Sequence, residues 1–482
     1  MNDCAAPPLA SDRRDDPREA ARRRATLALV ASGMFMAVLD TTIVNVALPA
    51  MRAHLGASVA GLAWIVDAYT LSFAALILAG GVASDRFGAK AVYLCGLALF
   101  VAASGACGLA PSVGVLIAAR FVQGTGAALF LPASLAIVRA TFDDPAQRAK
   151  AIAAWAGIAS IAAAIGPVAG GLLVDGFGWR SAFLVNVPTG IVALTGAYTV
   201  VRTTIPAAAR RFDWGGQIAS TVALAALCFA AIELPTRGLA AGEVIIAIAV
   251  ALIAAAALIM VERRVAAPLV PLPWFRNATF VAMNASGTLV YVGYFGLLFV
   301  LSLYLHGVRG LDARHTGLAM LPMAASLSLG NVLAGKLQEY ASAARLMTIG
   351  LTVATVAGPA MSLALDWDAG WVVVFIAMAA FGIGTALSVP PMIATVLEQV
   401  PAESAGVASG LLNALRQAGS LLGVAFAGAA TLLCRHLSTA LIAVGAMAGV
   451  AYAVAVVLAA RSSSVTATVP ADRTSDTVPQ SR

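Results

Sequence analysis

Residues 91–138 read AVYLCGLALFVAASGACGLAPSVGVLIAARFVQGTGAALFLPASLAIV, two apolar runs separated by a Pro-Ser turn, with Arg120 as their one charged residue. A helix needs about 20 mostly apolar residues to cross the hydrocarbon core of a bilayer, and each run is long enough. The whole chain follows this pattern: of 482 residues, 61% are hydrophobic and 11% are charged, where soluble domains carry about 25% charged residues. This composition excludes a soluble enzyme and a disordered chain, and the unbroken apolar runs exclude a β-barrel, whose strands alternate.

Fourteen such runs predict an all-α polytopic membrane protein with fourteen transmembrane helices. A first bundle of six helices covers residues 26–201, a linker region with two extra helices covers 202–278, and a second bundle of six covers 279–460. The polar ends, residues 1–25 and 461–482, are predicted to be disordered tails. The expected helices are 26–50, 60–80, 91–110, 113–138, 150–174, 181–201, 215–234, 242–261, 279–305, 316–336, 345–365, 371–396, 403–430 and 438–460.

Basic residues predict the orientation of these helices. With the N-terminus inside the cell, cytoplasmic segments hold 22 of the 30 Lys and Arg residues, and outer segments hold six. This asymmetry predicts a multi-pass protein of the inner (plasma) membrane with both termini in the cytoplasm. The net charge of +7 is spread over many short loops, so nucleic acid is not expected as a partner. Histidines without zinc spacing and cysteines without a C-x-x-C pair predict no metal site.

Two ionisable residues inside the first bundle are candidates for function, because charged groups are costly within a membrane. Asp40 lies about ten residues and Arg120 about seven residues from the outer ends of their helices, so their depths differ by about 5 Å. The two side chains could meet across the bundle, and an arginine that moves toward and away from the acid would drive proton uptake and release. A permanent structural ion pair is the alternative.

Asp67, in the second helix, is the third candidate for proton coupling and lies at much the same depth as Arg120. It could compete for that arginine, as a second acid suited to a cationic substrate. It could equally be a partly hydrated residue near the membrane interface. The sequence leaves both interpretations open.

Polar residues at helical spacing are candidates for a central substrate cavity. In the ninth helix they recur at i, i+4 and i+7, which places them on one face, and in the thirteenth they occupy adjoining turns. Hydrogen bonding between helices is an equally open interpretation of each residue alone. The candidates are Asn45, Gln123, Asn284, Thr288, Tyr291, Asn413 and Arg416.

Four stretches are similar to signatures of the major facilitator superfamily. GVASDRFGAK at 81–90 resembles the signature loop after the second helix, with Ala89 where the family usually has a basic residue. RFVQGTG at 120–126 resembles the second signature, and LDTTIVNVALP at 39–49 resembles the first-helix signature of the drug:proton antiporters. GPVAGG at 166–171 resembles the motif that marks exporters.

The resemblance implies roles for these residues. The loop would form a conformational gate that holds one state shut, although an Asp-Arg pair in a tight turn could also cap a helix. Glycines and proline in the exporter motif would shape a close interface between helices. The gate residues are Gly81, Asp85, Arg86, Gly88 and Lys90, and the antiporter motif consists of Gly166, Pro167, Gly170 and Gly171.

Further stretches resemble the fourteen-helix branch of the superfamily: WRSAFLVNVPTG at 179–190, FDWG at 212–215, PLVPLPWFRN at 268–277 and NALRQ at 413–417. The resemblance implies a secondary active transporter that exports drugs or other amphipathic small molecules by proton antiport, through alternating access. A dedicated exporter of one metabolite, such as an antibiotic or a siderophore, stays open. The proton gradient is the expected energy source, with no cofactor and no enzymatic activity. The expected partners are the lipid bilayer, the small-molecule substrate and protons; the chain is expected to be a monomer, and a periplasmic adaptor is left open.

Overall fold

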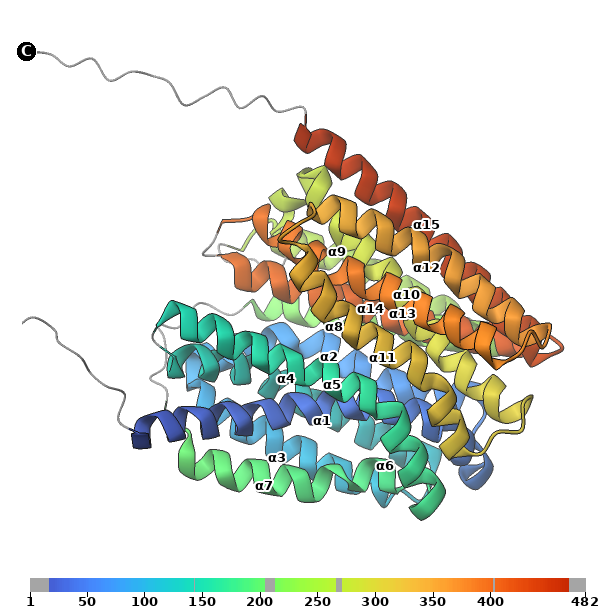
Figure 1. Ribbon diagram of the computed structural model, residues 1–482, viewed down its shortest axis with the longest axis horizontal. Helices are drawn as coiled ribbons and strands as arrows, with labels where there is room; N and C mark the ends of the chain where they lie inside the picture. The colour runs from blue at the N-terminus through green and yellow to red at the C-terminus, as the bar shows by residue number, and fades with distance from the viewer. Residues whose placement is uncertain (1–16, 143, 204–212, 266–270, 402–403, 468–482) are drawn as a thin grey trace, which may run out of the picture.

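The computed structural model describes residues 17–142, 144–203, 213–265, 271–401 and 404–467 (Figure 1). Within these ranges the long elements are all α-helices and no strand occurs, which confirms the predicted fold class. The first bundle contains α1 (Pro17–Leu55), α2 (Val59–Phe87), α3 (Ala89–Gly108), α4 (Val113–Thr141), α5 (Pro145–Phe177), α6 (Ser181–Leu184) and α7 (Asn186–Val200). The linker region contains α8 (Trp214–Arg237), α9 (Gly242–Glu262) and the short 3-10 helix η1 (Leu272–Arg276). The second bundle contains α10 (Ala278–Gly307), α11 (Ala313–Leu337), α12 (Ala343–Asp366), α13 (Trp371–Glu398), α14 (Ala405–Leu433) and α15 (Leu437–Ala467).

These helices make fourteen potential membrane spans. Thirteen segments in the described part of the chain are long and apolar enough to cross a bilayer, with α6 and α7 counted as one segment. α14, with 29 residues, is the fourteenth, and its middle is made more polar by Asn413, Arg416 and Gln417. The two extra spans, α8 and α9, fall between the two bundles in sequence, as expected.

The first and last helices are longer than expected. α1 begins at Pro17, because proline suits the first turn of a helix and Glu19 pairs with Arg22 at 2.6 Å and with Arg202 at 3.1 Å. α15 continues to Ala467. Residues 17–25 and 461–467 are therefore helical where disordered tails were predicted, and the rest of both predicted tails lies outside the described residues.

The two bundles repeat one packing scheme. α4 packs on α2 and α3 as α13 packs on α11 and α12, and α1 packs on α5 and α7 as α10 packs on α14 and α15. The bundles meet along two seams, α5 with α11 and α2 with α14. Small residues allow the close approach, since a methyl group at Gly317 of α11 would collide with the carbonyl oxygen of Pro167 in α5.

The linker helices lie beside one of these seams. α8 contacts both α2 and α14, whereas α9 packs mainly on α8. Trp64 Nε1 donates to Glu233 Oε1 at 3.1 Å, and Gln217 Nε2 donates to the carbonyl of Ala75 at 2.5 Å, so polar bonds hold α8 to α2 near both ends. α9 exposes large apolar side chains such as Leu252 and Ile253, as expected for a helix that faces lipid.

The bundles are closed against each other at the end opposite the termini. The first residues of α1 and the last of α15 lie on one side of the molecule, and the bundle axes diverge toward that side (Figure 1). Toward the other end, residues 43–49 of α1 and 297–305 of α10 are buried without a gap. Ser302 Oγ of α10 donates to the carbonyl of Asn45 in α1 at 2.5 Å and joins the bundles there.

Candidate functional site

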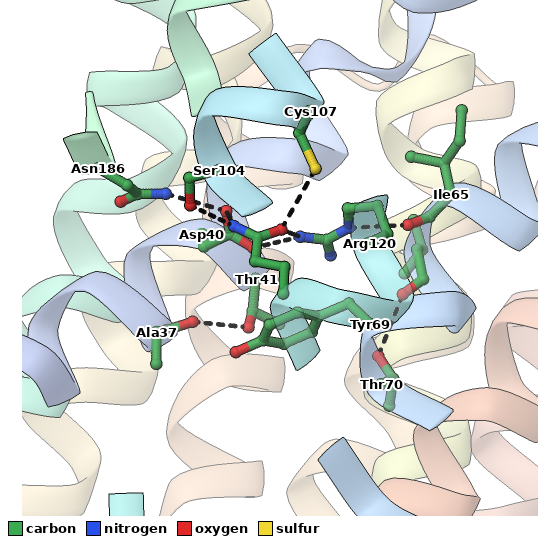
Figure 2. Close-up of polar contacts among 12 residues, drawn as sticks. Ala37, Asp40, Thr41, Ile65, Tyr69, Thr70, Ser104, Cys107, Arg120 and Asn186 are labelled. Carbon is green, nitrogen blue, oxygen red and sulfur yellow. Dashed lines mark hydrogen bonds and ion pairs between the residues drawn. The ribbon is translucent and has the colours of Figure 1, made fainter. Parts of the chain in front are cut away.

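A buried ion pair joins Asp40 of α1 to Arg120 of α4 inside the first bundle (Figure 2). Nη1 of Arg120 donates to Oδ2 of Asp40, and both side chains are at most 1% exposed. Nε of Arg120 donates to the backbone carbonyl of Ile65 in α2 at 3.0 Å, and its guanidinium lies 4.4 Å from the ring centroid of Tyr69. The structure therefore brings the two residues together and ties Arg120 to α2.

Two amide side chains surround the acid. Gln123 Nε2 donates to Asp40 Oδ1 at 2.8 Å, while Gln123 Oε1 accepts from Arg120 Nη1 at 2.7 Å. Asn186 Nδ2 of α7 donates to the same Asp40 oxygen at 3.1 Å, and Ser104 of α3 accepts from Gln123 Nε2 at 2.9 Å. Asp40 accepts from three donors, which satisfies the main requirement for a buried carboxylate. Side chains of α4 and α7 thus bond the acid of α1 directly, and Ser104 of α3 supports it through Gln123.

Asn186 lies where α6 passes into α7 within the sixth span. α6 ends at Leu184 and α7 begins at Asn186, but Val185 between them keeps helical backbone angles, with φ −60° and ψ −28°, so the two elements form one span in which Pro188 has no amide hydrogen to donate to the carbonyl of Leu184. Asn186 is only 1% exposed and is directed at Asp40. Sequence patterns did not single out Asn186, since its partner lies 146 positions away.

Asp67 of α2 lies apart from this network. Its side chain is fully buried, and neither carboxyl oxygen has a hydrogen-bond partner among the described residues. Asp67 lies on the α8 side of α2, one turn from the Trp64 that bonds Glu233, and near Cys228 of α8. In this conformation Asp67 therefore forms no ion pair with Arg120 and is not exposed to solvent.

The segment at 81–90 is helical for most of its length, where a loop was expected. Residues 81–87 form the last turns of α2 and α3 begins at Ala89, so that Gly88 alone turns the chain, with a φ of 88° that favours glycine. Asp85 is exposed, forms no ion pair within the described residues and does not cap α3, whose first turn has no side-chain cap. Lys90 donates to the carbonyl of Tyr198 in α7 at 2.8 Å.

The GPVAGG stretch of α5 lies between the two bundles. A methyl group at Gly166 would collide with Thr42 of α1, and one at Gly170 would come within 3.2 Å of the Ile43 Cα. On the other side, a methyl group at Gly171 would lie 2.6 Å from the carbonyl oxygen of Ala313 in α11. The antiporter motif therefore lets α5 approach α1 and α11 at once.

Polar residues of the second bundle form a separate group around Arg416 of α14. Arg416 Nη2 donates to the hydroxyl of Tyr291 in α10, whose ring centroid lies 4.4 Å from the guanidinium. Thr288 is half-buried and donates to the carbonyl of Asn284, and Asn413 is also half-buried. Asn284 and Asn45 are at most 2% exposed, and each donates to a carbonyl of its own helix. No group of three His, Cys, Asp or Glu side chains in the described ranges is arranged to hold a metal ion.

Comparison with known families matches residues 30–424 to the Major Facilitator Superfamily. The chain belongs to the major facilitator superfamily. It is 40% identical over 399 residues to the "Methylenomycin A resistance protein" of Streptomyces coelicolor, covering 83% of this chain and 84% of that protein. It is 37% identical over 403 residues to the "Multidrug resistance protein Stp" of Mycobacterium tuberculosis, covering 84% and 75%.

Solved structures share the same major facilitator fold. A POT family transporter in complex with a thioalcohol-conjugated peptide superposes with a TM-score of 0.68 at 14% identity, covering 90% of this chain and 96% of that one. The xylose transporter XylE from E. coli, in a partially occluded inward-open conformation, superposes with a TM-score of 0.60 at 14% identity, covering 93% and 99%. In this major facilitator protein, the signature residue Arg120 and the first-helix residue Asp40 are direct partners.

Proposed function

We propose that this protein is a secondary active transporter that exports drugs or other amphipathic small molecules by proton antiport. Relatives named for multidrug resistance and for a drug efflux pump, at 37% and 33% identity, support export of such compounds. The observation that carries the proton-coupling part is the buried pair of Asp40 and Arg120, which lies where no bulk water reaches it.

The coupling follows from the energetics of that pair. Moving Arg120 away from an ionised Asp40 would leave two uncompensated buried charges, and breaking such pairs costs about 3 to 5 kcal/mol. A proton on Asp40 removes one of these charges, so the bundles can change conformation with Asp40 protonated. One proton entering the cell gains about 2.3 kcal/mol per 100 mV, and at about 1.4 kcal/mol per tenfold this sustains roughly a forty-fold substrate gradient.

Alternating access would use the two ends of the bundle interface. With both termini in the cytoplasm, the buried contact of Asn45 with Ser302 closes the outer end, and this conformation opens toward the cytoplasm. Asp85 is exposed and has no ion-pair partner within the described ranges, which supports a gate role, because a contact that locks the opposite state should be broken in this one. Proton release from Asp40 and substrate entry would then occur from the cytoplasmic side.

The test uses everted membrane vesicles whose lumen is acidified by respiration, with a pH-sensitive dye. Addition of a transported compound should release lumenal protons through the wild-type protein and not through Asp40→Asn. Asp175→Asn is the matched control, since Asp175 is exposed at the end of α5 and its variant should respond as wild type does. Normal proton release by Asp40→Asn would contradict the proposal.

A dedicated exporter of one antibiotic is the second candidate. Two proteins named "Methylenomycin A resistance protein", from Streptomyces coelicolor and Bacillus subtilis, are 40% and 36% identical to this chain, which favours a narrow substrate range. A panel of structurally unrelated compounds separates the candidates. Proton release with many compounds supports multidrug export, and release with one compound class alone supports the dedicated exporter.

A further inference from the structure

A second arginine is buried within a span, and it has no acidic partner in the part of the chain that the structure describes. Arg416 of α14 is 9% exposed, close to the 1% of Arg120. Arg120 is neutralised by Asp40, whereas no ion pair involves Arg416 in the described ranges, and its Nε atom has no hydrogen-bond acceptor. Among the residues that the structure describes, the Tyr291 hydroxyl is the one polar partner of its guanidinium.

The surrounding helices offer no carboxylate to Arg416. The described parts of α10 to α15 contain two acidic residues, Asp366 and Glu398, and each is the last residue of its helix. In the first bundle, Asp40 is paired with Arg120, and Asp67 lies on the α8 side of α2. A charged group at this depth is costly unless it is paired or reaches water. The second bundle therefore holds a buried positive charge that an anionic ligand would neutralise.

The local packing gives the guanidinium a fixed place. Its stem passes Gly287 of α10, where an added methyl group would lie 3.2 Å from Arg416 Cγ and 3.0 Å from the Met392 sulfur of α13. The planar head then lies over the ring of Tyr291, which is half-buried and whose centroid lies 5.4 Å from that of the tilted Phe295 ring. A positive head next to an aromatic wall suits a ligand with one anionic group and an apolar body.

The outer end of the bundle interface carries the same sign of charge. A pocket of about 400 Å³ lies between the end of α1, the start of α2, α10 and the loop before α15. Arg52, Arg435 and His436 line it, and none of its lining residues is acidic. A departing anion would meet favourable potential there, as charged clefts attract ligands of opposite charge.

We propose that the substrates are amphipathic carboxylates, whose carboxylate binds Arg416 and the Tyr291 hydroxyl while the apolar body packs against the aromatic side chains of α10. This deepens the proposed function and rests on it. A guanidinium offers two parallel N–H donors to one carboxylate, and the free Nε of Arg416 supplies the second donor beside Nη. A monoanion that leaves while a proton enters moves two charges in the direction that an inside-negative potential favours, which suits export.

The experiment measures ligand binding by the purified full-length protein, as the rise in its melting temperature with ligand concentration. The probes are two matched sets: 1-naphthylacetate, 1-naphthylacetamide and 1-naphthylmethylammonium, and the corresponding three biphenylyl compounds. Carboxylates should raise the melting temperature of wild type more than their amide and ammonium counterparts do. Arg416→Gln should weaken the apparent affinity for carboxylates by tenfold or more. Arg416→Lys keeps the positive charge but loses the two parallel N–H donors, so its affinity should lie between those of wild type and Arg416→Gln.

Controls separate a binding role from a structural one. Arg345→Gln removes an exposed arginine at the start of α12 and should bind as wild type does. Without ligand, Arg416→Gln should melt at the same temperature as wild type or higher, because it removes an uncompensated charge. Preference for ammonium compounds, no response to any carboxylate, or equal carboxylate binding by Arg416→Gln would each overturn the inference. Proton release that depends on Asp40 is measured separately in vesicles, so failure here would leave the proton-antiport proposal standing.

Discussion

A double-mutant cycle on Asp40 and Arg120 measures how strongly the two charges depend on each other. Asp40→Asn leaves Arg120 buried without a counter-ion, and removal of one partner of such a pair costs about 3 to 5 kcal/mol. Arg120 keeps the Ile65 carbonyl, the Gln123 oxygen and the Tyr69 ring, which should reduce the loss by roughly 1 kcal/mol. We therefore expect about 2 to 4 kcal/mol for the single variant.

The double variant Asp40→Asn, Arg120→Gln has no buried charge at this position and should recover much of that loss. The coupling energy should be about 2 to 3 kcal/mol. Reversible unfolding in mixed micelles, followed by tryptophan fluorescence, provides the four free energies of unfolding. The surface pair of partly buried Arg309 and exposed Asp368 is the control, with an expected coupling below about 1 kcal/mol. A coupling energy under about 0.5 kcal/mol for Asp40 and Arg120 would refute this reasoning.

Other expectations follow from single contacts. Asn186→Ala removes one donor from Asp40 and should lower the free energy of unfolding by about 1.5 to 3 kcal/mol in the same unfolding assay. Asn186→Asp adds a second acid beside Asp40 and should therefore abolish antiport. Gly317→Val should block the close approach of α5 and α11 and abolish transport in vesicles without loss of membrane insertion; normal export would contradict the proposed seam. The backbone amide and the ring of His315 bond the Asp312 carboxylate and hold its pKa below the usual range. Asp312 therefore stabilises the start of α11 fully when the pH is above the pKa of the unfolded state, and this contribution is lost as the pH falls through the lower pKa of the folded state. The melting temperature of wild type should thus exceed that of Asp312→Ala at neutral pH and approach it in acid, and a difference that persists in acid would rule this out.

Apolar runs and helical rise were enough to predict the spans. Thirteen segments of the described residues are long and apolar enough to cross a bilayer, and the more polar α14 is the fourteenth long helix. The similar depths of Asp40 and Arg120 followed from 1.5 Å per residue along two helices. Their actual contact depends on which faces of α1 and α4 turn toward each other, and that comes from packing.

The rotation of each helix about its axis also explains where the structure differs from the positions expected from the sequence. Asp67 lies at the depth expected for it, yet α2 turns it toward α8, which packs on the face that also carries Trp64. Asn186 reaches Asp40 because α7 packs on α1 with this side chain turned toward it, and a continuous apolar run does not reveal which face turns inward. The segment at 81–87 stayed helical because it contains no proline, and one glycine, Gly88, suffices to turn the chain.

Proton release upon substrate binding tests proton coupling through Asp40 most directly. A transported compound is added to purified wild-type protein in weakly buffered detergent solution at a series of starting pH values, and the pH is recorded. Coupling through Asp40 predicts proton release in proportion to the amount of protein in wild type and in Asp175→Asn, and none in Asp40→Asn although the compound still binds. Equal proton release by wild type and Asp40→Asn would contradict the account.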